Sequence, residues 1–141
     1  MTGRLERELR EKRAAGRKLL VPYITGGYPG WQDAIRAAAA NGADAIEIGI
    51  PFSDPVMDGP VIQQASQAAL EGGATPISVL HEVPLLDVEI PLVVMTYYNI
   101  VHHDGHRRFA HRLVEAGFRT RAISAAVSRA DRPTPISVAE A

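Results

Sequence analysis

The stretch of sequence that decides the fold is residues 43–64, ADAIEIGIPFSDPVMDGPVIQQ. Its apolar start, interrupted by one carboxylate, predicts a buried strand, because β-branched side chains at this density favour sheet. Pro51 ends that strand, since proline has no N–H to donate to a sheet ladder. A loop rich in turn residues follows, and Val61, Ile62 and Ala65 then recur at helical spacing. A strand, an acidic loop and a helix in this order are typical of parallel βα units, which place catalytic groups at the C-terminal ends of their strands.

Two acids in this stretch are candidates for chemistry. Glu47 lies within the predicted strand, where burial would raise its pKa and allow proton transfer near neutral pH. The alternative is a glutamate at the strand edge that faces water or pairs with an arginine. Asp58 precedes a glycine and Asp54 precedes a proline, so ordinary turn chemistry is the simpler explanation for both.

The segment GIPFSDPVMDGPVIQ, residues 49–63, resembles the signature of tryptophan synthase alpha chains. The resemblance extends back through VPYITGGYPG (21–30), forward through MTYYNIV (95–101), and covers about residues 4–118. It implies an α/β fold of the TIM (β/α)8 barrel family, with about the first half of the barrel present. It also implies a lyase of tryptophan biosynthesis that cleaves indole-3-glycerol phosphate to indole and glyceraldehyde 3-phosphate.

The same resemblance suggests roles for particular residues. Glu47 matches the family's proton-transferring glutamate, and Asp58 matches the aspartate that faces the indole ring. Tyr97 and Tyr23 are expected to bind substrate, although half-buried packing at a strand end is the alternative for a tyrosine there. Three further residues match positions at which the family contacts its partner: Pro51, Asp54 and Asn99. The partner implied is the tryptophan synthase beta chain, in an alpha2-beta2 tetramer. In the family, pyridoxal phosphate belongs to the beta subunit, so neither a cofactor nor a metal is expected on this chain.

Other segments predict the elements around this site. Apolar and turn residues predict helices up to about residue 15 and over 31–41, and strands over 19–25 and 91–96. Thr75 is expected to cap a helix that Pro84 cuts short. The histidines near residues 102–106 look like a metal cluster, but the segment is better interpreted as a polar loop. A last helix is expected to contain Phe109 and Leu113.

The length of the chain raises a question about the second half of the barrel. The chain has 141 residues, whereas a complete barrel takes about 250. We expect residues 1–118 to form the half-barrel and 119–141 to form a divergent tail, from a frame slip or a truncated gene. The family's late loops, which bind the substrate phosphate, would then be missing and activity impaired. The alternative is a non-catalytic remnant that binds a beta subunit or another half-barrel.

Composition and charge exclude several classes of function. The absence of cysteine excludes disulfides and thiolate metal sites. The sequence lacks an apolar run of membrane-spanning length and the apolar core of a signal peptide, so we expect a cytoplasmic protein. Basic residues cluster at both ends, but those near the N-terminus interleave with acids at helical spacing, which favours a solvated face over nucleic-acid binding. Between Arg36 and Arg107 there are nine acids and no lysine or arginine.

Overall fold

The computed structural model describes residues 4–118 and 123–126. In this part of the chain the centre is a parallel sheet with the strand order β1-β2-β3-β4. The strands are β1 (Tyr23–Thr25), β2 (Ile46–Gly49), β3 (Leu92–Tyr97) and β4 (Ile123–Ala126). The helices are α1 (Arg4–Ala14), α2 (Trp31–Ala40), α3 (Pro60–Glu71), α4 (Pro76–Glu82), the 3-10 helix η1 (Val83–Leu86), α5 (Tyr98–Asp104) and α6 (His106–Glu115). Each strand is thus joined to the next through at least one helix, as parallel pairing requires.

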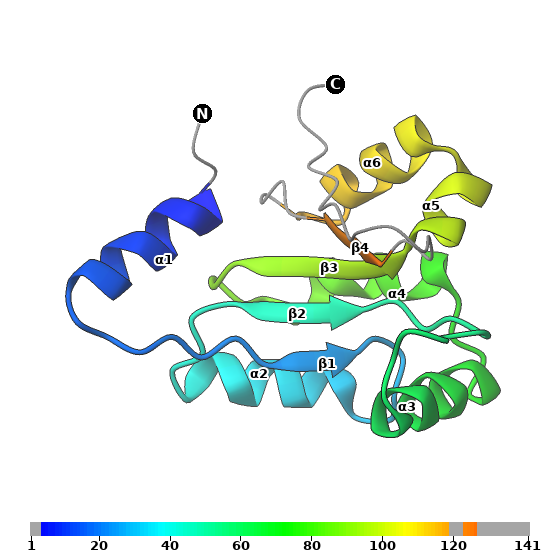
Figure 1. Ribbon diagram of the computed structural model, residues 1–141, viewed down its shortest axis with the longest axis horizontal. Coiled ribbons are helices and arrows are strands. Elements are labelled where there is room, and N and C mark those ends of the chain that lie inside the picture. Colours follow the sequence, from blue (N-terminus) through cyan, green and yellow to red (C-terminus); the bar gives the residue numbers. More distant parts are fainter. Residues whose placement is uncertain (1–3, 119–122, 127–141) are drawn as a thin grey trace.

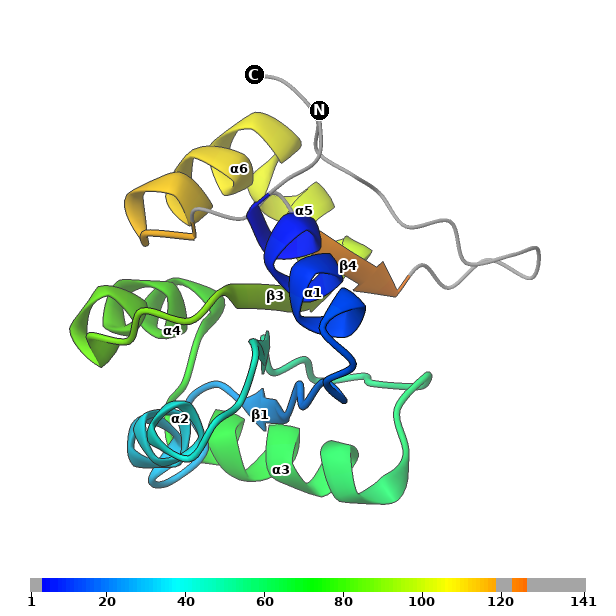
Figure 2. The same cartoon turned by 90° about the vertical axis from the view of Figure 1, so that its left-hand side faces the viewer.

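The helices cover one face of this sheet and its N-terminal end. Figure 1 shows the strands pointing the same way, with α1 beyond their N-terminal ends. Figure 2 looks from that end, with α1 in front and helices α2, α3, α4 and α6 along the outer side of the sheet. The opposite side of β1, β2 and β3 carries none of these helices in the described part of the chain. This layout is that of an incomplete barrel, with helices outside and an inner face left open.

Alternation along the strands separates the core from this inner face. Successive strand residues point to opposite sides of a sheet. Ile46, Ile48 and Val94 are almost fully buried and point toward the helices. The helices contribute large side chains to the same core, among them Ile35, Val79, Leu86, Phe109 and Leu113. Burial of these apolar side chains supplies the main favourable term in folding.

The structure corrects the predicted extent of the first strand. The sequence predicts a strand over residues 19–25, whereas β1 begins at Tyr23. Pro22 has no N–H to donate, and the backbone bonds from this segment to the neighbouring one are accepted by the carbonyl oxygens of Leu20 and Pro22, while the Leu20 N–H donates to the side chain of Asp44. Leu20 and Val21 are 57% and 43% exposed, so the apolar run there marks no buried strand.

Two further expectations near the end of the described chain are wrong. The segment with His102 and His103 forms helix α5 and not a polar loop, because Val101 buries on its inner side and Gly105, at φ 88°, starts the turn into α6. The segment after Phe118 is expected to be a divergent tail, whereas Ile123–Ala126 form strand β4, which pairs in parallel with β3 and places Val94 opposite Ile123. The rest of the predicted divergent tail, 119–122 and 127–141, lies outside the described residues.

The helix in the connection before β3, α4, is capped as the sequence predicts. Thr75 is the N-cap of α4 and forms a capping box with Ser78, in which each side chain accepts from the other residue's backbone N–H. The helix ends at Glu82, and η1, which contains Pro84, replaces a longer α-helix. The backbone then turns at Asp87, which has φ 50°, and leads into β3.

Candidate active site

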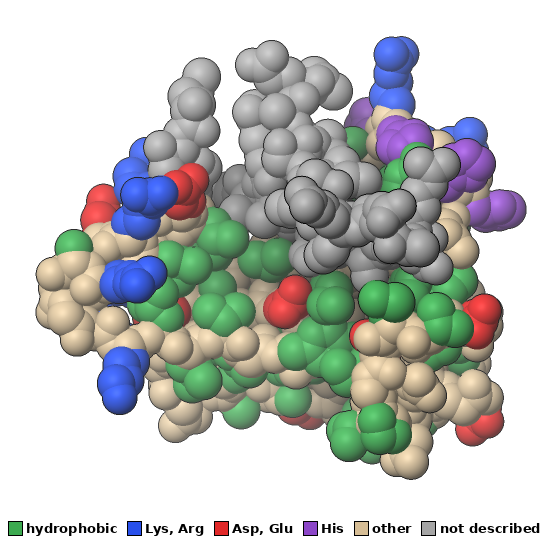
Figure 3. Space-filling model, in the orientation of Figure 1, with side chains coloured by type: hydrophobic (Ala, Val, Ile, Leu, Met, Phe, Trp, Pro, Cys, Tyr) green, Lys and Arg blue, Asp and Glu red, His purple; other side chains and the backbone are tan. Residues whose placement is uncertain are grey.

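The open face of the sheet carries most of the predicted site residues. Tyr23, Glu47 and Val93 lie side by side on β1, β2 and β3, because the register pairs them directly. Two positions further on, Thr25, Gly49 and Met95 form the next row on the same face. Figure 3 views the molecule from this side and shows hydrophobic side chains over the strands, with acidic side chains among them.

Glu47 is the charged residue within this face. Its side chain is half-buried between the neighbouring strands. Burial raises the pKa of Glu47 above the usual value for a glutamate, because the charged form loses hydration. A carboxyl group of this kind retains a proton at a higher pH than a surface glutamate, which suits general acid–base chemistry.

Asp58 reaches the same face from the loop between β2 and α3. The Tyr97 hydroxyl donates to Asp58 Oδ2 at 3.1 Å, and the Met57 N–H donates to the Tyr97 oxygen at 3.1 Å. The Phe52 ring stacks on Tyr97 with ring centroids 4.8 Å apart. From α3, the Gln63 side chain donates to the Asp58 carbonyl at 2.8 Å. The last residue of β3 therefore anchors the acidic loop over the C-terminal end of the sheet.

Tyr23 connects the two acids. Burial raises the pKa of the Tyr23 phenol; a hydrogen bond with the Thr25 side chain offsets part of this rise, and the negative charges of Asp58 and Glu47 add to it. Burial likewise raises the pKa of Tyr97, with smaller contributions from its contact with Asp58 and from Tyr23. Each phenol thus responds to the charges around it, so the two acids and two tyrosines form one electrostatic cluster.

The residues expected to meet a partner chain differ in their exposure. Asp54, in the loop after β2, and Asn99, in the first turn of α5, have exposed side chains. Pro51 is among the most deeply buried residues of the described chain. The structure therefore leaves Asp54 and Asn99 accessible at the C-terminal end of the sheet, whereas Pro51 is buried.

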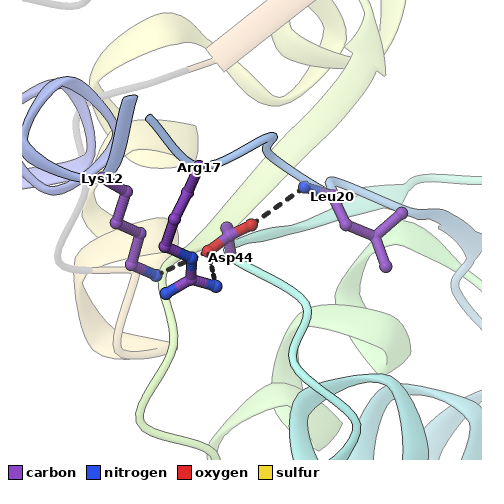
Figure 4. Close-up of polar contacts among 4 residues, drawn as sticks. All are labelled: Lys12, Arg17, Leu20 and Asp44. Carbon is purple, nitrogen blue, oxygen red and sulfur yellow. Dashed lines mark hydrogen bonds and ion pairs between the residues drawn. The ribbon is translucent and has the colours of Figure 1, made fainter. Parts of the chain in front are cut away.

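A cluster at the opposite end of the sheet was not among the sequence predictions. Asp44, just before β2, is 1% exposed and accepts a hydrogen bond from the Leu20 N–H at 2.9 Å. Lys12 Nζ lies 2.9 Å and Arg17 Nη2 lies 3.4 Å from Asp44 Oδ1 (Figure 4). The hydrogen bond with Lys12, followed by that from Leu20, lowers the pKa of Asp44. This cluster ties α1 to the start of β2. The sequence feature that could have indicated it is an acidic residue directly before a predicted buried strand.

Four of the five histidines lie on α5 and α6, at one end of the molecule (Figure 3), and the fifth, His81, lies on α4. The Tyr98 hydroxyl lies 2.9 Å from His106 Nε2, and the His102 ring packs against both. Within residues 4–118 and 123–126, no group of three or more His, Cys, Asp or Glu side chains is arranged to hold a metal ion. In the same part of the chain, none of the helices is long and apolar enough to cross a membrane.

Comparison with known sequences identifies the family. The family description of the tryptophan synthase alpha chain matches residues 9–126, most of the chain. The chain belongs to the tryptophan synthase alpha chain family. The tryptophan synthase alpha chain of Halorhodospira halophila is 46% identical over 120 residues, which are 81% of this chain and 44% of that relative.

Solved structures extend this agreement to the fold. The alpha subunit of tryptophan synthase from Legionella pneumophila is 37% identical, has a TM-score of 0.77, and is matched over 83% of this chain and 47% of that one. A tryptophan synthase structure from M. tuberculosis is 39% identical with a TM-score of 0.74, over 82% of this chain and 49% of that chain. The chain thus spans about half the length of the relatives it matches, and the prediction of an incomplete TIM barrel is confirmed.

Proposed function

We propose that the chain carries the acid–base part of a tryptophan synthase alpha-type lyase site, which cleaves indole-3-glycerol phosphate to indole and glyceraldehyde 3-phosphate in the cytoplasm. The observation that supports this proposal most directly is the cluster on the open face. Glu47, with its raised pKa, and Asp58, held by Tyr97, share that face and both act on Tyr23. Family membership supplies the reaction for which such a cluster is suited.

The cleavage requires three events around the indole ring. A proton is added to C3 of the ring, the bond from C3 to the glycerol chain breaks with its electrons returning to the ring, and the adjacent hydroxyl loses its proton as it becomes the aldehyde. Glu47 donates the first proton and, once ionised, accepts the second, so protons balance over the cycle. Asp58 accepts a hydrogen bond from the ring N–H and stabilises the positive charge that develops there.

The tyrosines position this chemistry. Tyr97 holds the Asp58 carboxylate through its hydroxyl, so the acid does not have to be ordered when substrate binds. Tyr23 is half-buried on the open face and offers a ring surface against which an indole can pack. The Tyr97 ring, in contrast, is buried and stacks on Phe52, so Tyr97 would act on the substrate through the Asp58 that it holds. Both tyrosines belong to strands, which fix a side chain more firmly than loops do.

The phosphate group of the substrate limits the turnover that we expect from the chain on its own. Between Arg36 and Arg107 the sequence has nine acids and no lysine or arginine, which disfavours a doubly negative group near the described loops. A lost phosphate anchor reduces turnover as well as affinity, because binding energy from a remote group is used to position the reacting atoms. We therefore expect turnover near background for the 141-residue chain on its own.

Indole release from indole-3-glycerol phosphate tests the proposal directly. The chain is assayed alone and with a separate polypeptide that comprises the second half of a complete relative. Activity should rise on complementation, and Glu47→Gln or Asp58→Asn should each remove about 10²–10⁴-fold of it. Equal turnover by parent and Glu47→Gln in an active mixture would exclude Glu47 as the proton donor.

A second candidate function is binding without catalysis to a tryptophan synthase beta chain, which would carry the pyridoxal phosphate. The exposure of Asp54 and Asn99 at the C-terminal end of the sheet favours it. Titration of a beta chain with this polypeptide, followed by calorimetry, should give saturable binding that Asp54→Ala weakens. Arg108→Ala, a change on exposed α6, is the matched control.

A further inference from the structure

The ring of Tyr23 on β1 lies across Gly49 of the neighbouring strand. A Cβ atom added to Gly49 would lie 1.8 Å from the Tyr23 oxygen and 2.4 Å from its Cζ. Glycine weakens the interior of a strand, and Gly49 has no positive φ that would require it. Its role in β2 is therefore to admit the Tyr23 ring.

This arrangement places Tyr23 beside Glu47. The register pairs Tyr23 with Glu47, and Gly49 is the next residue of β2 on the same face. A ring that starts at position 23 and ends over Gly49 passes along the C-terminal side of Glu47, from which a ligand would approach. Val93 flanks Glu47 on β3.

The charged and titratable groups around Glu47 are few in the described part of the chain. Tyr23 faces Glu47 from β1. The charge of Asp58, from the loop after β2, and the hydroxyl of Tyr97, at the end of β3, act on Tyr23 in turn. Burial, and not a neighbouring charge, raises the pKa of Glu47. The neighbouring group that controls access of water to Glu47 therefore controls its proton affinity.

We propose that Tyr23 is a positioning residue for Glu47: its ring, admitted by Gly49, covers the carboxyl on the C-terminal side and shields it from water. The inference rests on the proposed function for the role of Glu47, and it adds a residue pair that prepares the general acid. The Tyr23 phenol is also in hydrogen-bond contact with the Thr25 side chain, which lowers its pKa, while burial and the charges of Asp58 and Glu47 raise it, so the phenol keeps its proton throughout the neutral range.

The test follows the titration of Glu47 directly, without substrate. The full chain is labelled with ¹³C at glutamate side-chain carboxyls, and Glu47 is assigned by the signal lost in Glu47→Gln. In Tyr23→Ala the pKa of Glu47 should fall toward the ordinary value of about 4.3, whereas Tyr23→Phe, which keeps the ring, should retain the raised value. Gly49→Ala displaces the ring and should act like Tyr23→Ala. If Tyr23→Ala does not fold, Tyr23→Val replaces it.

Two matched variants control for general effects. Tyr28→Ala removes another half-exposed tyrosine, from the loop after β1, and Gly59→Ala adds a methyl group in open space. Both should leave the Glu47 titration unchanged. An unchanged pKa in Tyr23→Ala, or the same fall in Tyr23→Phe, would overturn the inference. The expected titration in a complemented chain that releases no indole would overturn the proposed function alone.

Discussion

The anchoring of the acidic loop by Tyr97 leads to a quantitative prediction for Tyr97→Phe. The change removes the hydrogen bond to Asp58 Oδ2 and the bond from the Met57 N–H, both 3.1 Å long, and keeps the ring that stacks on Phe52. A hydrogen bond to a charged group contributes about 1.5–3 kcal/mol and a neutral one about 1 kcal/mol. Because Met57 is 63% exposed, water replaces part of this loss, and we expect a cost of about 2 kcal/mol.

Amide hydrogen exchange measures this cost at the loop itself. The Met57 N–H is bonded to Tyr97, so a loss of about 2 kcal/mol should raise its exchange rate by about 30-fold. Urea unfolding of the same variant shows whether the loss reaches the whole domain. Tyr98→Phe is the control, since the neighbouring hydroxyl contacts only the exposed His106 among the described residues. Equal exchange of Met57 in Tyr97→Phe and Tyr98→Phe would refute the anchoring role.

Four other predictions concern stability. Glu47→Gln should stabilise the chain at neutral pH by urea unfolding, because a raised folded pKa makes ionised Glu47 costly as pH rises. Asp44 has a lowered folded pKa, so its contribution is present above about pH 4 and lost as pH falls further; acid unfolding of Asp44→Asn should lack this part of the transition. Gly26→Ala should destabilise the fold by about 1–3 kcal/mol and so lower the thermal midpoint, because its Cβ would lie 2.5 Å from Val79 Cγ1. Thr75→Ala should lower stability by about 1 kcal/mol, through loss of the capping box.

Much of the fold was accessible from local sequence patterns. The apolar run before Pro51, the helical spacing after it, and Thr75 with Pro76 each define an element through nearby residues alone. The length of the first strand was overestimated, because the exposure of Leu20 and Val21 depends on which residues pack nearby and not on their own hydrophobicity. Strand β4 was missed, since its four residues have little pattern of their own and pairing with β3 is a long-range interaction.

The candidate site was predictable by residue type and less so by arrangement. Glu47 was expected to be desolvated, and its raised pKa agrees with that reasoning. The bond from Tyr97 to Asp58 joins residues that are 39 positions apart, so no local spacing reveals it. The Asp44 cluster joins three separate segments of the chain in the same way. Contacts of this kind depend on strand register, which only the folded sheet defines.

The order of strands in the sheet also bears on how such a chain can assemble during synthesis. Each strand pairs with the strands directly before and after it in the sequence, without exchange of places. A growing chain can therefore add each βα unit to the edge left by the previous one, in the order in which the ribosome releases them. The two acids come together once β2, its loop and β3 have emerged, so the candidate site is assembled before any later barrel strand is made.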